Sequence, residues 1–372
     1  MKKILKLLEF LGFKDEIGEN LRDYNFLINL DEKEYPKYLA KLFYLKTGEK
    51  LPLLKEWSFK DCRTGKAFLN LFNKSENEEK GYPRGQGFRK YIIDKKRCKT
   101  FNQKIQYIKL YGITDLMRDC TDKAKVRDYV RKKIGNEYLK PVLQVVSSEE
   151  SGVRSNNLNF SLSTLNTPLF DKIDFEKLPE SFVIKCSHGC KWHYIIKNKE
   201  EYMNNKLLVD LTRKNITGWL EQDYSFWCGL ELNYHGIEPK ILIEQLLREN
   251  LDTLCQNIHV YCFNGLAKYI VKIYQNNKIS IYDENLNLTE DIFEFNEQKI
   301  NIKADDLINQ SFVLSEQLSK DFIFVRVDWM IYKNKLYFEE LTFTPYSGFH
   351  KFCDKKKNLK LGKLINLERA VK

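Results

Sequence analysis

The sequence lacks several features that would assign it to a class of protein at once. No uninterrupted apolar run reaches the ~20 residues that a helix needs to cross a bilayer, and charged residues interrupt the apolar stretch at the start of the chain. The nine cysteines are odd in number and scattered, which argues against a disulfide framework. We therefore expect a cytoplasmic protein with reduced thiols. Peripheral contact with the inner face of the membrane, through an amphipathic N-terminal helix, is the alternative.

A zinc cluster is also incomplete. Cys186 and Cys190 flank a Ser-His-Gly sequence, and His193 follows, but no second cysteine pair at zinc-finger spacing completes such a site.

The lysines are spread through the chain and do not concentrate in one basic, aromatic-rich stretch, so we expect no nucleic-acid partner.

What the chain has in abundance is length, aromatic residues and positive charge. A chain of 372 residues exceeds one ordinary core and predicts two or three lobes. The 24 Phe and 21 Tyr exclude a disordered chain. A net charge of +11 indicates an anionic partner.

Hydrophobic periodicity predicts mixed secondary structure. Helical patterns occupy about the first 50 residues, 101–111 and, after a cap at Thr121, 122–134. Short apolar runs predict strands at 182–186, 193–197, 241–247, 258–263, 268–274 and 279–282, and a hairpin at 322–342. This order favours α+β lobes over a doubly wound parallel sheet.

The hairpin raises an electrostatic question. With a turn at 333–335, strand alternation sets Asp328 opposite Glu340. The same register sets Arg326 opposite Thr342. Opposed like charges destabilise a hairpin by up to ~1 kcal/mol, and Mg²⁺ shared with phosphate oxygens would remove the repulsion. A solvated face with lysines nearby, or a register shifted by one residue, would remove it too.

These residues resemble a known family. Arg-Val-Asp followed by Glu-Leu-Thr is similar to the Arg-x-Asp and Glu-x-Asn metal hairpin of the ATP-grasp superfamily. More narrowly, several segments resemble its teichuronopeptide-biosynthesis (TupA-like) branch, in the family's order from about 100 to 365: TFNQKIQYIKLY, CTDKAKVRDYVRKKIGNEYLKP, LPESFVIKCSHG, IEPKILIEQLL, VYCFNG and FVRVDWMIYKNKLYFEELTFTPYSGFHKF. With parts of 30–55, the resemblance covers roughly three quarters of the chain.

The resemblance implies an α+β ATP-grasp fold, in which the nucleotide lies between two antiparallel sheets, with an extra helical N-terminal region. The implied domains are a helical region at 1–99 with a family-atypical insertion near 55–99, an N-terminal and central lobe at 100–180, a small ATP-binding subdomain at 181–247, and a C-terminal lobe with the metal site at 248–372.

The resemblance also implies ATP and Mg²⁺ as cofactors. Arg326 matches the catalytic residue that stabilises the transferring phosphoryl group. Asp328 and Glu340 match the metal carboxylates, and Thr342 stands where the superfamily usually has Asn. The matching cofactor-binding residues are Lys123, Lys185, His188, Gly189, Lys191, Glu244, Gln245, Leu247, Glu249, Asp252 and Lys278. The candidates for substrate contacts are Arg127, Ser347 and Gly348.

Three points stay open within this resemblance. Either Glu249 or Asp252 would take the ribose hydroxyls. His259 stands where the family often has Lys, so that phosphate contact would have moved to Lys272 or Lys278 or been lost. The loop after Lys185 keeps its His-Gly, but Cys, Lys and Trp replace its later glycines.

The implied activity is an ATP- and Mg²⁺-dependent carboxylate-amine ligase with an acyl-phosphate intermediate. It would act in cell-surface or capsular polysaccharide biosynthesis, on an anionic sugar acid, nucleotide sugar or glycan together with a small amine or amino acid. The alternatives are a glycosyltransferase of the same pathway and an ATP-grasp binding protein with weakened catalysis.

Overall fold

The computed structural model describes residues 98–148, 169–222, 224–226, 231–248, 255–290, 292–293, 295, 297–348 and 350–370. The predicted N-terminal helical region, nearly all of the 55–99 segment, and the two ribose candidates Glu249 and Asp252 lie outside these residues.

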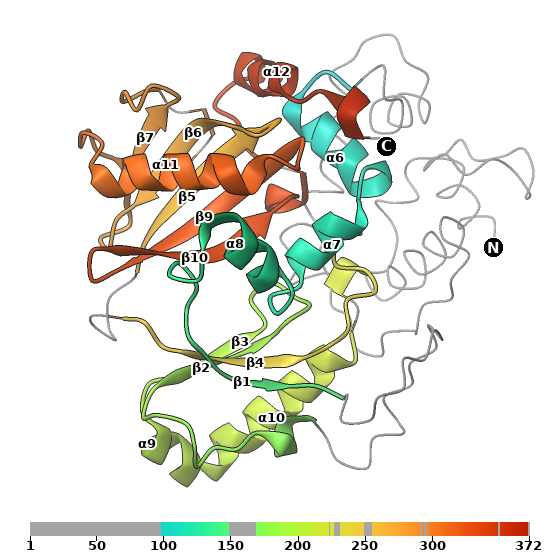
Figure 1. Ribbon diagram of the computed structural model, residues 1–372, viewed down its shortest axis with the longest axis vertical. Helices are drawn as coiled ribbons and strands as arrows, with labels where there is room; N and C mark the ends of the chain where they lie inside the picture. The colour runs from blue at the N-terminus through green and yellow to red at the C-terminus, as the bar shows by residue number, and fades with distance from the viewer. Residues whose placement is uncertain are drawn as a thin grey trace, which may run out of the picture.

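Two sheets organise the described part of the chain (Figure 1). The small sheet is antiparallel throughout, in the order β1-β4-β2-β3. The large sheet has the order β10-β9-β5-β6-β7-β8 and is antiparallel except for β7 and β8. Small-sheet strands are β1 Val142–Val146, β2 Phe182–Cys186, β3 His193–Ile196 and β4 Ile241–Gln245. Large-sheet strands are β5 Gln256–Phe263, β6 Leu266–Ile273, β7 Lys278–Asp283, β8 Gln298–Lys299, β9 Phe324–Tyr332 and β10 Lys335–Thr342.

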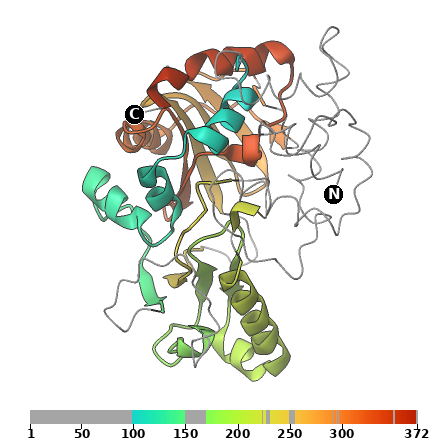
Figure 2. The same ribbon diagram turned by 90° about the vertical axis from the view of Figure 1, so that its right-hand side faces the viewer.

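Helices cover one face of each sheet. Helix α11 (Asp306–Ser319) lies across the large sheet, and α9 (Lys199–Asn204) and α10 (Lys206–Leu220) lie against the small sheet (Figures 1 and 2). The other helices among the described residues are α6 Phe101–Tyr111, α7 Asp115–Thr121, α8 Val126–Ile134 and α12 Lys355–Leu364, with short 3₁₀ turns η5 Leu169–Lys172, η6 Tyr224–Phe226, η7 Pro345–Gly348 and η8 Leu367–Ala370.

Local sequence explains where these helices begin and end. Helix α6 has the predicted bounds, because Thr100 and Gln103 form a reciprocal capping box at its first turn. The predicted cap at Thr121 is wrong. Thr121 is the last residue of α7 and its hydroxyl donates to the Met117 carbonyl, so α8 begins only at Val126. Gly135 ends α8 with a φ of 101°, a conformation that glycine adopts without strain.

Each sheet has its own apolar core. Residues of α6, α7 and α8 are buried with the large sheet, whereas Trp192, α10 and η5 are buried with the small sheet. Strand β1 belongs to the small sheet although α8, which precedes it, packs with the large one. The segment 136–141 between them therefore passes from one part to the other. Its Tyr138 carbonyl accepts a hydrogen bond from the Phe338 N–H on β10 at 2.7 Å.

The predicted hairpin is present, with a different turn. Lys333 and Asn334 form a two-residue turn, both with left-handed φ values of 48° and 55°, in place of the predicted turn at 333–335. A β-bulge between Phe338 and Glu340 then inserts one extra residue. The two differences cancel, so Asp328 does face Glu340, and Arg326 does face Thr342.

Candidate functional site

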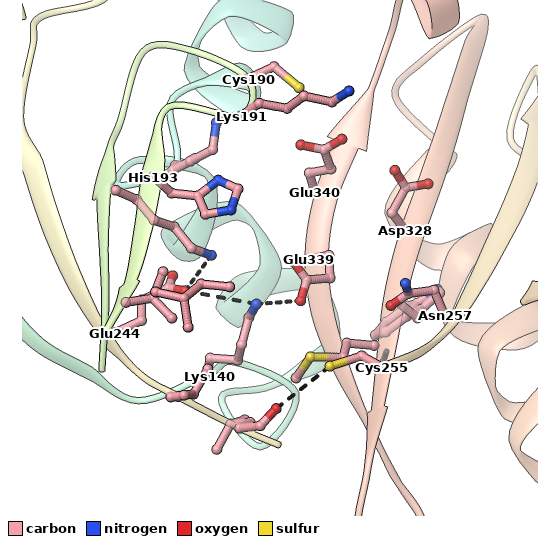
Figure 3. A pocket seen from close by; sticks show the side chains of 18 of the residues that line it. Lys140, Cys190, Lys191, His193, Glu244, Cys255, Asn257, Asp328, Glu339 and Glu340 are labelled. Carbon is pink, nitrogen blue, oxygen red and sulfur yellow. Dashed lines mark hydrogen bonds and ion pairs between the residues drawn. The ribbon is translucent and has the colours of Figure 1, made fainter. Parts of the chain in front are cut away.

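A cavity of about 490 Å³ lies between the two sheets (Figure 3). The small-sheet side and its connections contribute Lys123, Lys140, Val183, Lys185, Cys190, Lys191, Trp192, His193, Ile195 and the segment 244–248. The large-sheet side contributes Cys255, Asn257, His259, Arg326, Asp328, Trp329, Met330, Glu339 and Glu340. Residues from distant parts of the sequence thus share one concave site, which is the usual form of a small-molecule site.

Arg326 places one positive charge between the two opposed carboxylates of the large-sheet wall. Its Nε donates to Oδ1 of Asp328 at 2.7 Å and its Nη2 donates to Oδ2 at 2.6 Å. The same Nη2 lies 4.0 Å from Oε1 of Glu340. The Thr342 hydroxyl lies 3.0 Å from one oxygen of each acid. The positive group that the sequence required between Asp328 and Glu340 is therefore supplied, in this state, by the chain itself.

Burial and charge set the protonation of this wall. Burial alone would lower the pKa of Arg326, but the ion pair with Asp328 outweighs it and the pKa lies well above its usual value. His259 on β5 pairs with Asp328 on β9. Burial, reinforced by the Arg326 charge, lowers the pKa of His259 to about 3. At neutral pH the wall therefore carries one buried cation and a neutral imidazole.

The donor set of this wall suits a shared magnesium ion. Within the described ranges, no group of three or more His, Cys, Asp or Glu side chains is arranged to hold a metal. Mg²⁺ keeps several waters and is usually held by one or two carboxylates together with phosphate oxygens. Asp328 and Glu340 fit that role provided that Arg326 gives up one Asp328 oxygen. The residues therefore fit an ion that arrives with a phosphate-bearing ligand.

On the opposite side, Glu244 lies among lysines. Nζ of Lys185 is 2.6 Å from Oε2 of Glu244, and Nζ of Lys140 is 3.8 Å from the same oxygen. Lys140 also pairs with Glu339 across the cavity. Burial alone would raise the pKa of Glu244, but the two lysines outweigh it and lower the pKa to about 2. Lys185 itself is held charged, because Glu244 and Glu339 raise its pKa against the effect of burial.

The sequence prediction missed Lys140 and Glu339. Lys140 precedes β1, a strand that was not predicted, and its carbonyl accepts a hydrogen bond from Arg127 at 2.7 Å. Strand alternation would turn Glu339 to the face opposite Glu340, but the bulge lets both line the cavity. A bulge leaves no periodic signal in the sequence, so no pattern could have found Glu339.

The loop after β2 is anchored by Trp192. A Cβ on Gly189 would lie 2.1 Å from the Trp192 ring, so only glycine fits there. The Gly189 carbonyl accepts a hydrogen bond from Nζ of Lys123. Lys191, with a φ of 62°, lines the cavity. His188 does not line the cavity. Its Nε2 contacts the Trp219 carbonyl of α10 at 3.0 Å, so its ring packs into the small-sheet core.

The strand end at 244–247 lines the cavity, but some of its polar groups already have partners. The Gln245 N–H donates to the Pro141 carbonyl at 3.0 Å. A nucleotide base would therefore have to form its hydrogen bonds with other atoms of this segment. The Leu247 carbonyl accepts a weak hydrogen bond from the Cys255 thiol at 3.9 Å. Glu244, a predicted cofactor-binding residue, is held by Lys185.

Four further candidates lie outside the cavity lining that the structure describes. Lys278 begins β7, two strands beyond β5, which lines the cavity. Lys272 pairs with Asp305, the N-cap of α11, on the face turned away from the cavity. Arg127 does not line the cavity and donates a hydrogen bond to the Lys140 carbonyl. The buried Gly348 belongs to η7, beyond the hairpin, and the side chain of Ser347 is outside what the structure describes.

The sequence matches the family described as TupA-like ATPgrasp over residues 103–366. No curated protein matches it. Among solved structures, a D-alanine–D-alanine ligase from Bacillus anthracis shares 15% identity over 68% of this chain and 66% of that chain, with a TM-score of 0.35. The same ligase complexed with ATP matches at 15% identity, 60% and 53% coverage and a TM-score of 0.31.

A phosphoribosylamine–glycine ligase from Thermotoga maritima is 11% identical over 73% of this chain and 55% of that chain, with a TM-score of 0.32. The chain thus spans about half to two thirds of the length of these solved structures. At such TM-scores the likeness carries no argument about the site. The family match covers well over half of the sequence, and the two facing sheets agree with it. The chain therefore belongs to the TupA-like ATP-grasp family and has the α+β fold of ATP-grasp proteins.

Proposed function

We propose that the chain is an ATP- and Mg²⁺-dependent ligase that joins a carboxylate to an amine. One observation carries the proposal. A single cavity combines the lysines of the small-sheet side with the Arg326, Asp328 and Glu340 wall of the large sheet. Phosphoryl transfer depends mainly on positioning and on positive charge around the phosphoryl oxygens, and both are present around this cavity.

The roles of the small-sheet residues follow from their positions. Lys123, Lys185 and Lys191 line the cavity and would hold the nucleotide phosphates. Gly189 keeps this loop in place, since its carbonyl binds Lys123 and its missing side chain makes room for Trp192. Leu247 and Met330 supply apolar surface from opposite walls for the base.

At the large-sheet wall, Arg326 would move from its bidentate grip on Asp328 toward the oxygens of the transferring phosphoryl group. Asp328 and Glu340 would hold magnesium, and the Thr342 hydroxyl, within 3.0 Å of an oxygen of each, would donate its proton to one of the two acids. When bound, the ion would neutralise phosphate charge and orient the terminal phosphate.

The proposed reaction has two steps. A substrate carboxylate oxygen attacks the γ-phosphorus of ATP and ADP leaves, which gives an acyl phosphate. A neutral amine then attacks the acyl carbon. Inorganic phosphate departs, and the amine proton passes to solvent. The neutral His259 beside Asp328 avoids adding a second buried positive charge to this wall.

The substrate class in this proposal is an anionic sugar acid, as a nucleotide sugar or glycan, with a small amine or amino acid as acceptor. Net charge of +11 supports an anionic substrate. Around the cavity, the described lining includes six Lys or Arg side chains against four Asp or Glu. The resemblance to the teichuronopeptide branch supports a role in cell-surface or capsular polysaccharide assembly at the cytoplasmic side. Among the described residues, no helix is both long and apolar enough to cross a membrane.

An ADP-release screen over uronic-acid donors and small amines, with Mg²⁺, tests this proposal. Mass spectrometry should find a product equal to acid plus amine minus water. Asp328→Asn and Glu340→Gln should each lower ADP release by ~10²–10³-fold, as expected when charge stabilisation of the transition state is lost. Glu284→Gln, an exposed acid paired with Lys268 on the same sheet, serves as the control. Full ADP release by both cavity variants, or a product that retains phosphate and lacks the amine, would overturn the proposal.

A further inference from the structure

Lys140 contacts acids from both walls of the cavity. It pairs with Glu339 on β10, and its Nζ lies 3.8 Å from Oε2 of Glu244 on β4 (Figure 3). Its own backbone is fixed, because Arg127 donates to its carbonyl at 2.7 Å. The adjacent Pro141 carbonyl accepts a hydrogen bond from the Gln245 N–H. The Lys140 ammonium can therefore move between two acids while its Cα stays in place.

Glu244 needs a cation at all times. Its side chain is only 8% exposed, and removing the partner of a buried carboxylate leaves an uncompensated charge. Lys185 is its nearest partner, at 2.6 Å. Yet the proposed function requires Lys185 to turn to a nucleotide phosphate. If it did so alone, it would strip Glu244 of its closest counter-ion.

We propose that Lys140 is a positioning residue that takes over Glu244 when Lys185 turns to a nucleotide phosphate, and releases Glu339 as it does so. This inference rests on the proposed function, because it needs a nucleotide in the cavity. The distances suit the exchange, since Lys140 Nζ has to approach Glu244 by only about 1 Å to reach hydrogen-bond distance.

The two acids differ in a way that sets the direction of this exchange. The Glu339 side chain is 30% exposed, against 8% for Glu244. Solvent can therefore accept the Glu339 charge when Lys140 leaves, whereas it cannot reach Glu244. The charged groups that face Glu244 are Lys185 from β2, Lys140 from the segment before β1 and Arg127 from α8. If Lys185 turned away and Lys140 were absent, Arg127, which binds the Lys140 backbone, would be the one cation of these three still facing Glu244.

Isothermal titration calorimetry of the full-length protein with AMP-PNP and Mg²⁺ at pH 7 tests the exchange. Repeating the titration in buffers of different ionisation enthalpy measures the number of protons taken up on binding. The unaltered protein should bind without proton uptake at Glu244. In Lys140→Met, Glu244 should take up as much as one proton when Lys185 leaves it, and affinity should fall by at least about tenfold. Lys140→Arg should restore both values. Lys177→Met, an exposed lysine paired with Asp174, is the matched control.

Glu339→Gln gives an independent check, because it frees Lys140 for Glu244. It should bind the nucleotide at least as tightly as the unaltered protein, without proton uptake. A Lys140→Met protein that binds normally with no proton uptake would refute the inference alone. So would a Glu339→Gln protein as weak as Lys140→Met. Failure of the unaltered protein to bind nucleotide would instead refute the proposed function, and this inference with it. Lys140→Met should fold, since Lys185 still pairs with Glu244 in the free protein.

Discussion

At the scale of single residues, charged side chains that line the cavity form ion pairs with one another. Arg326 binds Asp328, and Lys185 and Lys140 share Glu244. Such pairs stabilise the fold little compared with apolar packing, but breaking one leaves a costly buried charge. The pairs therefore keep charged groups in place until a ligand replaces one partner.

The Glu244 pair predicts a specific dependence of stability on pH. The pKa of Glu244 is about 2 in the folded protein, below its usual value of 4.5. The pair therefore contributes fully above pH 4.5, and its contribution is lost as the pH falls toward 2. The expected size is on the order of 3 kcal/mol in the free energy of unfolding. Urea unfolding of the unaltered protein and Glu244→Gln at pH 7, 5, 4 and 3 measures it.

The gap between the two proteins should be widest at pH 7 and should narrow below pH 4.5, where the Glu244 carboxyl binds a proton in the unfolded chain but stays ionised in the folded protein. Glu200→Gln, which changes an exposed acid in the first turn of α9, should give curves parallel to those of the unaltered protein. A gap of constant size down to pH 3 would contradict the assigned role of Glu244.

At the scale of elements, the hairpin shows what the sequence could predict and where it failed. Alternation of side chains correctly placed Asp328 opposite Glu340, although the turn was one residue too long and a bulge compensated for it. Six short apolar runs correctly predicted strands β2 to β7. Strand β1 was missed, and its apolar Leu143 and Val145 are 37% and 54% exposed. Its apolar residues therefore do not mark a buried face.

For the site too, sequence motifs identified some residues and missed others whose place depends on the tertiary structure. Family motifs led to six residues that line the cavity, namely Lys123, Lys185, Lys191, Arg326, Asp328 and Glu340. Motifs alone could not show that His188 turns toward α10, because the direction of its ring depends on how Trp192 packs between sequence-distant elements. Lys140 carries no motif either. Its place in the site follows only from the tertiary course of the segment before β1.

The loop after β2 gives a prediction with an internal control. Gly189→Ala should displace the Trp192 ring and lower the free energy of unfolding by ~1–3 kcal/mol, the usual cost of overpacking. Gly218→Ala lies inside α10, where an added Cβ meets nothing within 4 Å. It should stabilise the protein by roughly 0.5–1 kcal/mol. Urea unfolding followed by tryptophan fluorescence compares them, and equal stabilities would refute the tight contact at Gly189.

At the scale of the whole molecule, the two apolar cores formed by the described residues face one another across the cavity. Their links in the described chain include the Lys140–Glu339 pair and the hydrogen bond from Phe338 to Tyr138. A ligand that contacts both walls would add a further link. Its effect on stability should therefore require residues of both sheets.

Thermal unfolding with AMP-PNP, Mg²⁺ or both tests this coupling. Mg²⁺ alone should shift the midpoint little, because Arg326 already occupies both oxygens of Asp328. Both together, at 100 times Kd, should stabilise the protein by ~2.7 kcal/mol, which corresponds to a shift of roughly 3–4 °C for a chain of 372 residues. Lys185→Met in the small sheet and Asp328→Asn in the large sheet should each remove most of that shift. A shift that survives either substitution would mean that the ligand is held by one wall alone, because each substitution leaves the opposite wall unchanged.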